Sequence, residues 1–176
     1  MVANHNQPCL APSEWVLRYA PFVSKHGRVL DVACGSGRHS RLFATNGHSV
    51  AGVDRDLARF TDVPTTVELL EADIEGGPWP YGEERFAGVV VANYLHRPLF
   101  ARLIECVAPG GVLIYETFAA GNELYGRPMR PDFLLQPGEL LDVVRGQLKV
   151  VAYEDIYTDL PKPAMVQRIA AVRAHP

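Results

Sequence analysis

The 176-residue sequence lacks the features that mark membrane, secreted and metal-binding proteins. It has no apolar run long enough to cross a membrane, and its first residues do not join a charged stretch to an apolar one, so we expect a cytoplasmic protein without a membrane partner. The sequence has only three cysteines, which is an odd number. They lack the paired spacing of a metal site, so no metal is expected. They are Cys9, Cys34 and Cys106.

An excess of basic residues is also missing. The formal net charge of −3 gives no positive footprint for nucleic acid, so a small-molecule substrate is the expected partner. The hydrophobic content of 48% is enough for one well-buried domain, whereas the length is too short for two ordinary ones. We therefore expect a single domain over residues 1–176, with a loose arm over 1–11, that acts as a monomer or as a homodimer.

The most informative segment that is present runs from Val29 to His39. A short apolar run that contains Asp31 is followed by a turn with Gly35 and Gly37 and then by a predicted helix. Glycines allow a ligand to approach the main chain closely, and the helix start offers free N–H groups. A dinucleotide-binding turn would have a third glycine where this chain has Ser40, which disfavours a nicotinamide-dependent dehydrogenase but leaves it as an alternative.

Apolar runs alternate with helical patterns along the rest of the chain. This alternation predicts an α/β fold: a Rossmann-like, seven-stranded, mostly parallel sheet with an antiparallel hairpin at one edge and helices on both faces. The expected strands are 28–33, 49–53, 65–71, 86–93, 112–118, 148–154 and 167–174. The expected helices are 13–20, 38–46, 98–107 and 137–144, with a short helix at 56–60, a loop at 75–80 and a turn at 108–111.

Polar residues stand at or just after the ends of four neighbouring strands of this predicted sheet. They are Asp31, Asp54, Asp73 and Asn93. Ligands of open parallel sheets bind beyond the carboxyl ends of the strands, so we expect these side chains to converge on one site. A single acid at a strand end is as readily a helix cap or a turn residue, but packing does not explain the whole set.

The spacing Asp31-x-x-Cys34-Gly35-x-Gly37, followed by Asp54, resembles the first two motifs of class I S-adenosylmethionine-dependent methyltransferases. The resemblance implies S-adenosyl-L-methionine as cofactor and S-adenosyl-L-homocysteine as product. It also implies that Asp54 holds the ribose hydroxyls, that Asp73 bonds the adenine amine and that Ile74 lies against the ring; a carboxylate can accept both hydrogen bonds of a diol. The expected cofactor-binding residues are Asp31, Ala33, Cys34, Gly35, Gly37, Arg38, His39, Asp54, Arg55, Asp73, Ile74, Asn93 and Tyr94.

Some residues of this set have two interpretations. Cys34 is interpreted as a small residue of the turn rather than as a nucleophile. His39 either lines the carboxylate end of the cofactor or caps the helix. After the fourth strand, Asn93 and Tyr94 stand where an amine acceptor would be oriented, and His96 is either a general base or a polar residue bonded beside the loop. Tyr94 and His96 are the candidate catalytic residues.

A long polar and aromatic segment, residues 117–135, follows the fifth predicted strand. It is either a lid or a coil that covers the sheet edge. Its Tyr125, Arg127 and Arg130, with Arg97 from the preceding loop, are the candidate substrate-binding residues, because arginine forms bidentate contacts with anions. Arg127 has the alternative of bonding main-chain carbonyls and holding the loop.

The chain as a whole is similar to small bacterial methyltransferases related to the tellurite-resistance protein family. The Cys-Gly-x-Gly-Arg turn, the Ile-x-Glu-Thr-Phe strand and the Tyr-Gly-Arg-Pro loop carry this similarity. Tellurite or selenite would be acceptors by resemblance only, because fold does not determine substrate. We therefore expect in-line transfer of a methyl group to a small-molecule acceptor, with a cofactor-binding protein that does not catalyse as the alternative.

Overall fold

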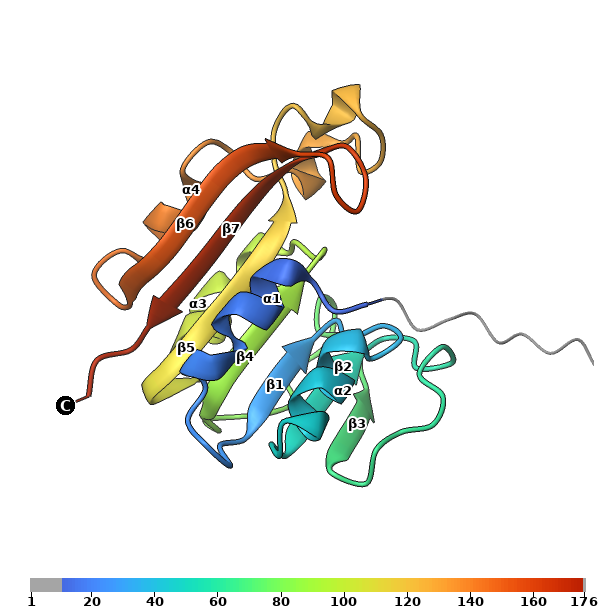
Figure 1. Ribbon diagram of the computed structural model, residues 1–176, viewed down its shortest axis with the longest axis vertical. Helices are drawn as coiled ribbons and strands as arrows, with labels where there is room; N and C mark the ends of the chain where they lie inside the picture. The colour runs from blue at the N-terminus through green and yellow to red at the C-terminus, as the bar shows by residue number, and fades with distance from the viewer. Residues whose placement is uncertain (1–10, 176) are drawn as a thin grey trace, which may run out of the picture.

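A seven-stranded sheet forms the centre of the computed structural model, which describes residues 11–175 (Figure 1). Its strand order is β3-β2-β1-β4-β5-β7-β6. Strands β1 to β5 are parallel, and β7 is antiparallel to both β5 and β6. The strands are β1 (Val29–Val32), β2 (Val50–Asp54), β3 (Val67–Glu71), β4 (Phe86–Ala92), β5 (Val107–Phe118), β6 (Lys149–Thr158) and β7 (Ala164–Val172).

This topology confirms the predicted mostly parallel sheet with an antiparallel edge hairpin. The order of the strands reverses between β1 and β4, which is the switch point at which open α/β sheets bind ligands. The expected arm over residues 1–11 lies outside the described residues except for its last residue, and Cys9 also lies outside them. The helices are α1 (Glu14–Tyr19), α2 (Arg38–Thr45), α3 (Phe100–Glu105) and α4 (Glu139–Val144), with 3-10 turns η1 (Ala20–Phe22), η2 (Arg97–Leu99), η3 (Asn122–Leu124) and η4 (Pro131–Phe133).

Helices cover both faces of the sheet. In Figure 1, α1 and α2 lie on the near face and α3 and α4 on the far face. The near-face core contains Trp15, Val16 and Phe43, which are at most 2% exposed. The far-face core contains Leu103 and Leu140, at most 1% exposed. Burial on both faces accounts for the nearly continuous apolar sequence of β4, as expected for a central parallel strand.

Two local predictions were wrong, and one predicted helix has different bounds. Residues 56–60 form no helix; they contain a turn at residues 58 and 59. The helix expected at 98–107 begins as the 3-10 turn η2 and ends at Glu105. The turn expected at 108–111 is an irregularity inside β5, because Phe86 pairs with Val107 and Gly88 with Val112, so that the extra residues of β5 bulge outward.

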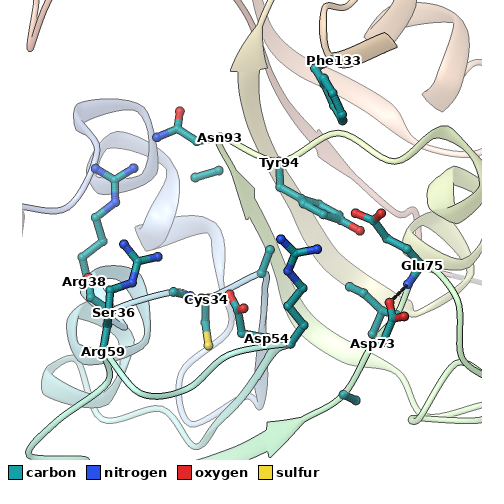
Figure 2. Close-up of a pocket in the computed structure, with 16 residues that line it drawn as sticks. Cys34, Ser36, Arg38, Asp54, Arg59, Asp73, Glu75, Asn93, Tyr94 and Phe133 are labelled. Atoms are coloured by element: carbon teal, nitrogen blue, oxygen red, sulfur yellow. Dashed lines mark hydrogen bonds between the residues drawn. The ribbon is translucent and has the colours of Figure 1, made fainter. Parts of the chain in front are cut away.

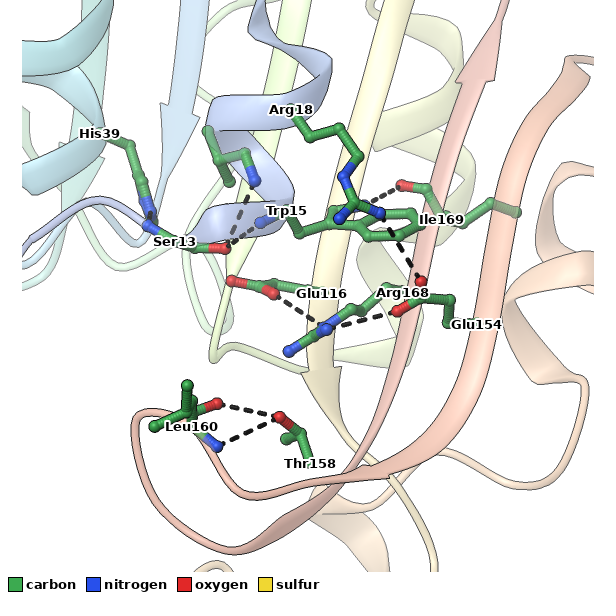
Figure 3. A network of polar contacts seen from close by, with 11 residues as sticks. Ser13, Trp15, Arg18, His39, Glu116, Glu154, Thr158, Leu160, Arg168 and Ile169 are labelled. Carbon is green, nitrogen blue, oxygen red and sulfur yellow. Dashed lines mark hydrogen bonds and ion pairs between the residues drawn. The ribbon is translucent and has the colours of Figure 1, made fainter.

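Helix α1 and its cap contact both β7 and helix α2 on the near face of the sheet (Figure 3). The Ser13 hydroxyl caps α1 by accepting hydrogen bonds from the main-chain N–H groups of Trp15 and Val16, at 3.1 and 3.3 Å. The Trp15 indole donates to the main-chain carbonyl of Ile169 in β7 at 3.2 Å. The main-chain N–H of Ser13 donates to Nε2 of His39 at 3.2 Å, which ties α1 to α2.

Beside this contact, Figure 3 shows a group of ions across the antiparallel strands. The Arg168 guanidinium on β7 lies 3.3 Å from Glu116 on β5 and 3.3 Å from Glu154 on β6. Glu116 is 8% exposed, so the pair with Arg168 is shielded from solvent. These ion pairs lie on the same face of the sheet as α1. They join the antiparallel strands β6 and β7 to β5, the neighbouring strand of the parallel part of the sheet.

The contact between Ser13 and His39 generates a prediction about stability. His39 is 4% exposed and accepts a hydrogen bond, so its ring is neutral. Burial and the neighbouring Arg38 lower the pKa of His39 from 6.5 to about 3. Between these two values the unfolded chain binds a proton that the folded chain does not, so His39 destabilises the fold increasingly as the pH falls below 6.5.

We expect the replacement His39→Gln, which keeps an acceptor for Ser13, to remove this pH dependence. Between pH 7 and pH 5 the wild type should lose about 2 kcal/mol of stability relative to the variant, as measured by urea unfolding. The control is His175→Gln, which removes an exposed ring and should follow the wild type. Parallel pH profiles for wild type and His39→Gln would contradict the assignment.

Candidate functional site

A cavity of about 570 Å³ opens at the carboxyl ends of β1 to β4 (Figure 2). Its size lies within the range of small-molecule sites, and its position is the switch point of the sheet. Main-chain and side-chain atoms from four strand ends and from the loop after β5 form its wall. The lining residues are Ala33, Cys34, Gly35, Ser36, Arg38, Asp54, Arg55, Arg59, Ala72, Asp73, Ile74, Glu75, Ala92, Asn93, Tyr94 and Phe133.

The chain leaves β1 and β4 through residues with a left-handed backbone. Ala33 has φ of 53° and Asn93 has φ of 56°, values that are unusual for residues other than glycine. Asparagine tolerates this conformation better than alanine does. Both residues line the cavity, so the strained backbone lies where the strands turn into the site.

The glycine turn uses its two glycines differently. Gly35 has φ of 54°, and a Cβ added to it would meet no atom within 4 Å, so this residue faces open space at the cavity wall. Gly37 has φ of 78°, and a Cβ there would lie 2.1 Å from the Phe60 ring. Gly37 therefore permits close packing, whereas Gly35 presents its main chain to the cavity.

Asp54 lies at the centre of the cavity wall and holds the glycine turn. Its Oδ2 accepts a hydrogen bond from the main-chain N–H of Gly35 at 2.8 Å, and its Oδ1 accepts one from the N–H of Asp56 at 3.1 Å. A carboxylate has about four lone-pair positions, so these two bonds leave acceptor capacity on both oxygens. Asp54 can thus brace the turn and still bind a pair of hydroxyl groups.

Asp73, after β3, has the same acceptor character. Its Oδ1 accepts main-chain N–H groups of Glu75 and Gly76, both at 3.0 Å, and these bonds lower the pKa of the carboxyl. In the described part of the chain no hydrogen bond engages Oδ2 of Asp73. Ile74, 7% exposed, adds an apolar surface beside it. This part of the cavity can hold a flat ring with a donor group at its edge.

Asp31 lies beneath the turn rather than in the cavity wall. Its side chain is 2% exposed and accepts a hydrogen bond from the Ser40 hydroxyl at 2.6 Å. Burial raises the pKa of Asp31 to about 6, and the hydrogen bonds with Ser40 oppose that rise. Gly37 and His39 also lie outside the lining residues. Cys34 does line the cavity, and burial raises the pKa of its thiol, which keeps it protonated.

Tyr94 separates the large cavity from a second one of about 230 Å³. Figure 2 shows its buried hydroxyl directed toward the carboxylate of Glu75. Burial and the carboxylate of Glu75 raise the pKa of this hydroxyl, so it stays protonated and can donate. His96, the other candidate catalytic residue, lines neither cavity; its Nδ1 lies 3.9 Å from Glu75.

The four candidate substrate-binding residues line neither cavity. Arg97 bonds the Glu139 carboxylate at 2.7 and 2.9 Å and the main-chain carbonyls of residues 132 and 134 at 2.8 Å, so it holds the loop after β5. Arg130 pairs with Asp132 at 2.8 Å. Tyr125 packs on the Tyr157 ring, with centroids 5.0 Å apart. Arg127 precedes a cis peptide bond to Pro128 and lines neither cavity.

Sequence reasoning missed several residues of the large cavity: Ser36, Arg59, Ala72, Glu75, Ala92 and Phe133. Ser36 stands between the two glycines, and Ala72 and Glu75 flank Asp73 and Ile74, so their positions in the sequence could have indicated them. Phe133 gives no such signal, because it comes from the segment 117–135, far along the chain from the strand ends.

Two negative findings concern residues 11–175. This part of the chain contains no group of three or more histidine, cysteine, aspartate or glutamate side chains that could hold a metal ion. None of its helices has the length and apolar character needed to cross a membrane.

Comparison with known proteins places this site in context. A family model described as a methyltransferase domain matches residues 3–147. A search of curated proteins gives no match. The structure of TehB from Haemophilus influenzae superposes with a TM-score of 0.77 at 17% identity, covering 94% of this chain and 63% of that protein, so this chain spans less than two thirds of its length.

This chain spans a larger share of two further proteins of known structure. A SAM-dependent methyltransferase from Methanosarcina mazei has a TM-score of 0.68 at 16% identity, covering 95% of this chain and all of that protein. The 1,6-didemethyltoxoflavin-N1-methyltransferase of Burkholderia thailandensis, with S-adenosylhomocysteine bound, has a TM-score of 0.64 at 18% identity, covering 91% of this chain and 76% of that protein. At these identities the likeness shows the fold.

The contrast between the two glycines of the turn gives a prediction. We expect Gly37→Ala to destabilise the protein by about 2–4 kcal/mol, because it combines backbone strain with overlap on Phe60. We expect Gly35→Ala to cost only about 1–2 kcal/mol, the backbone strain alone. Thermal and urea unfolding of the two variants measure the difference. Equal losses of stability would show that the Phe60 ring does not restrict the space at residue 37.

Proposed function

Because the chain belongs to the methyltransferase domain family, we propose that it transfers a methyl group from S-adenosyl-L-methionine to a small-molecule acceptor. The observation that carries the proposal is the convergence of the Asp54 and Asp73 carboxylates with the open face of Gly35 in one cavity at the switch point of the sheet. Two carboxylates with unused acceptor positions suit a ligand that carries hydroxyl and amino donors.

The residues present fit the cofactor in its three parts. Gly35, Ser36 and Arg38 would hold the amino-acid end, where the guanidinium offers a charge for a carboxylate. Asp54 would accept both ribose hydroxyls, because its two hydrogen bonds to main-chain N–H groups leave lone pairs on each oxygen. Asp73 would accept the adenine amine.

The rest of the lining supports this assignment. Ala72 and Ile74 would pack against the adenine ring, and Arg55 and Arg59 line the same cavity. Asp31, Gly37 and His39 would act indirectly in this proposal, by holding the turn and helix α2 in place. Bound in this way, S-adenosylmethionine supplies an electrophilic methyl group on a sulfonium sulfur.

The protein itself has little acid–base chemistry to perform. Methyl transfer needs an acceptor aligned with the methyl group and protected from water, effects that can contribute about 7–11 kcal/mol. Asn93 and Tyr94 stand at the junction of the two cavities and would orient the acceptor there. The didemethyltoxoflavin methyltransferase, with its small-molecule substrate, supports a small acceptor by analogy.

The cofactor assignment predicts the effect of removing one carboxylate. We expect Asp54→Ala to weaken binding of S-adenosylhomocysteine by about 10- to 100-fold, because hydrogen bonds to a charged acceptor are lost. Isothermal titration calorimetry measures the affinity, with circular dichroism to verify folding. The matched control is Asp56→Ala, which removes a carboxylate of the same loop that lies outside the cavity. Equal affinities in the two variants would refute the ribose assignment.

Catalysis requires a separate test. Transfer of a labelled methyl group should be measured across small amines, thiols, carboxylates and chalcogen oxyanions, with the wild-type protein. We expect at least one class to be methylated. Tight binding of S-adenosylhomocysteine without turnover of any acceptor would favour a cofactor-binding protein that does not catalyse.

A further inference from the structure

The second cavity, of about 230 Å³, opens directly from the larger one. The two share Glu75, Asn93, Tyr94 and Phe133, so a molecule in the small cavity would reach the junction that Asn93 and Tyr94 form. Beyond this junction, the wall of the small cavity is mostly apolar. The residues that line the small cavity alone are Leu95, Thr117, Phe118 and Pro128.

The charge of this lining is negative. Among the residues that the structure describes, no arginine or lysine lines the small cavity, and Glu75 is its one charged side chain. Arg97 bonds Glu139, and the Lys162 ammonium lies 5.8 Å from the centroid of the Phe118 ring without lining the cavity. Nδ1 of His96 lies 3.9 Å from the Glu75 carboxylate, but His96 does not line the cavity either. An anionic acceptor would therefore meet the Glu75 carboxylate without an arginine or lysine among the described lining residues to compensate it.

Aromatic rings and one hydroxyl donor complete the cavity. Figure 2 shows Phe133 above Glu75 and Tyr94 beside it, and Phe118 belongs to the same wall. The Tyr94 hydroxyl is directed toward the Glu75 carboxylate, so it can donate a hydrogen bond to that carboxylate or to a ligand beside it. Aromatic faces and a carboxylate together suit a nitrogen base on an aromatic or apolar body.

We propose that the small cavity binds the methyl acceptor, and that this acceptor is an amine or nitrogen heterocycle whose N–H group bonds Glu75. The inference rests on the proposed methyltransferase function and specifies its substrate class. It differs from the oxyanion acceptor suggested by resemblance, because the candidate substrate-binding arginines Arg97, Arg127 and Arg130 line neither cavity.

The charge balance of the reaction agrees with this lining. An acceptor that binds as an ammonium ion first loses one proton to water. The lone pair of the neutral nitrogen then forms the new N–C bond, while the electrons of the broken C–S bond go to sulfur, which becomes a neutral thioether. The positive charge therefore moves to the acceptor nitrogen, which then releases its N–H proton to Glu75 or to water. A carboxylate next to that nitrogen stabilises the charge as it develops there.

The test compares two aromatic probes of opposite charge. Binding of benzylamine and of benzoate to the wild-type protein, saturated with S-adenosylhomocysteine, is measured by ligand-observed NMR. We expect benzylamine to bind and benzoate and selenite to bind more weakly. Glu75→Gln should weaken benzylamine about threefold to fivefold, as for a partly exposed ion pair, and leave benzoate unchanged or stronger.

Glu71→Gln is the matched control, since it removes an exposed carboxylate at the end of β3 that lines neither cavity. It should leave both affinities unchanged, and circular dichroism verifies that both variants fold. Benzoate or selenite binding more tightly than benzylamine, or an unchanged benzylamine affinity in Glu75→Gln, would overturn this inference and leave the proposed function standing. Failure of the wild type to bind S-adenosylhomocysteine would instead overturn the proposed function on which it rests.

Discussion

The hydrogen bond from the main-chain N–H of Gly35 to the Asp54 carboxylate, at 2.8 Å, is the contact on which the site depends. It joins the turn after β1 to the end of β2, and so fixes the floor of the cavity. A second carboxylate, Asp31, supports the same turn from below through Ser40. Loss of the Asp54 carboxylate would leave the main-chain N–H of Gly35 without this acceptor at the cavity wall.

The two ends of the cavity differ in charge. Arg38 and Arg59 lie on the side of Ser36 and the glycine turn, whereas Asp73 and Glu75 lie on the opposite side, which leads to the small cavity (Figure 2). A ligand with a carboxylate at one end and donor groups at the other would match this polarity in one orientation only. The same arrangement leaves no arginine or lysine among the described residues that line the small cavity, and the proposal of a basic acceptor rests on that lining.

The sequence predicted the sheet and much of the large cavity because both depend on local patterns. Apolar runs indicate the strands, and the carboxyl ends of parallel strands meet, so Asp54, Asp73 and Asn93 could be brought together without a structure. Arg97 could not be placed, because its partner Glu139 lies in a distant helix and nothing near Arg97 indicates it. Phe133 reaches the cavity through that same loop, so its position depended on tertiary contacts as well.

The bond between Trp15 and Ile169 has a consequence for how the chain folds during synthesis. The indole belongs to the first helix and its acceptor to the last strand, 154 residues later. The parallel strands β1, β2 and β4 emerge from the ribosome earlier and can pair while β7 is still unmade. Helix α1 is translated before these strands and yet is among the last of the described elements to gain all its contacts, so its apolar face stays open to chaperones until β7 is made.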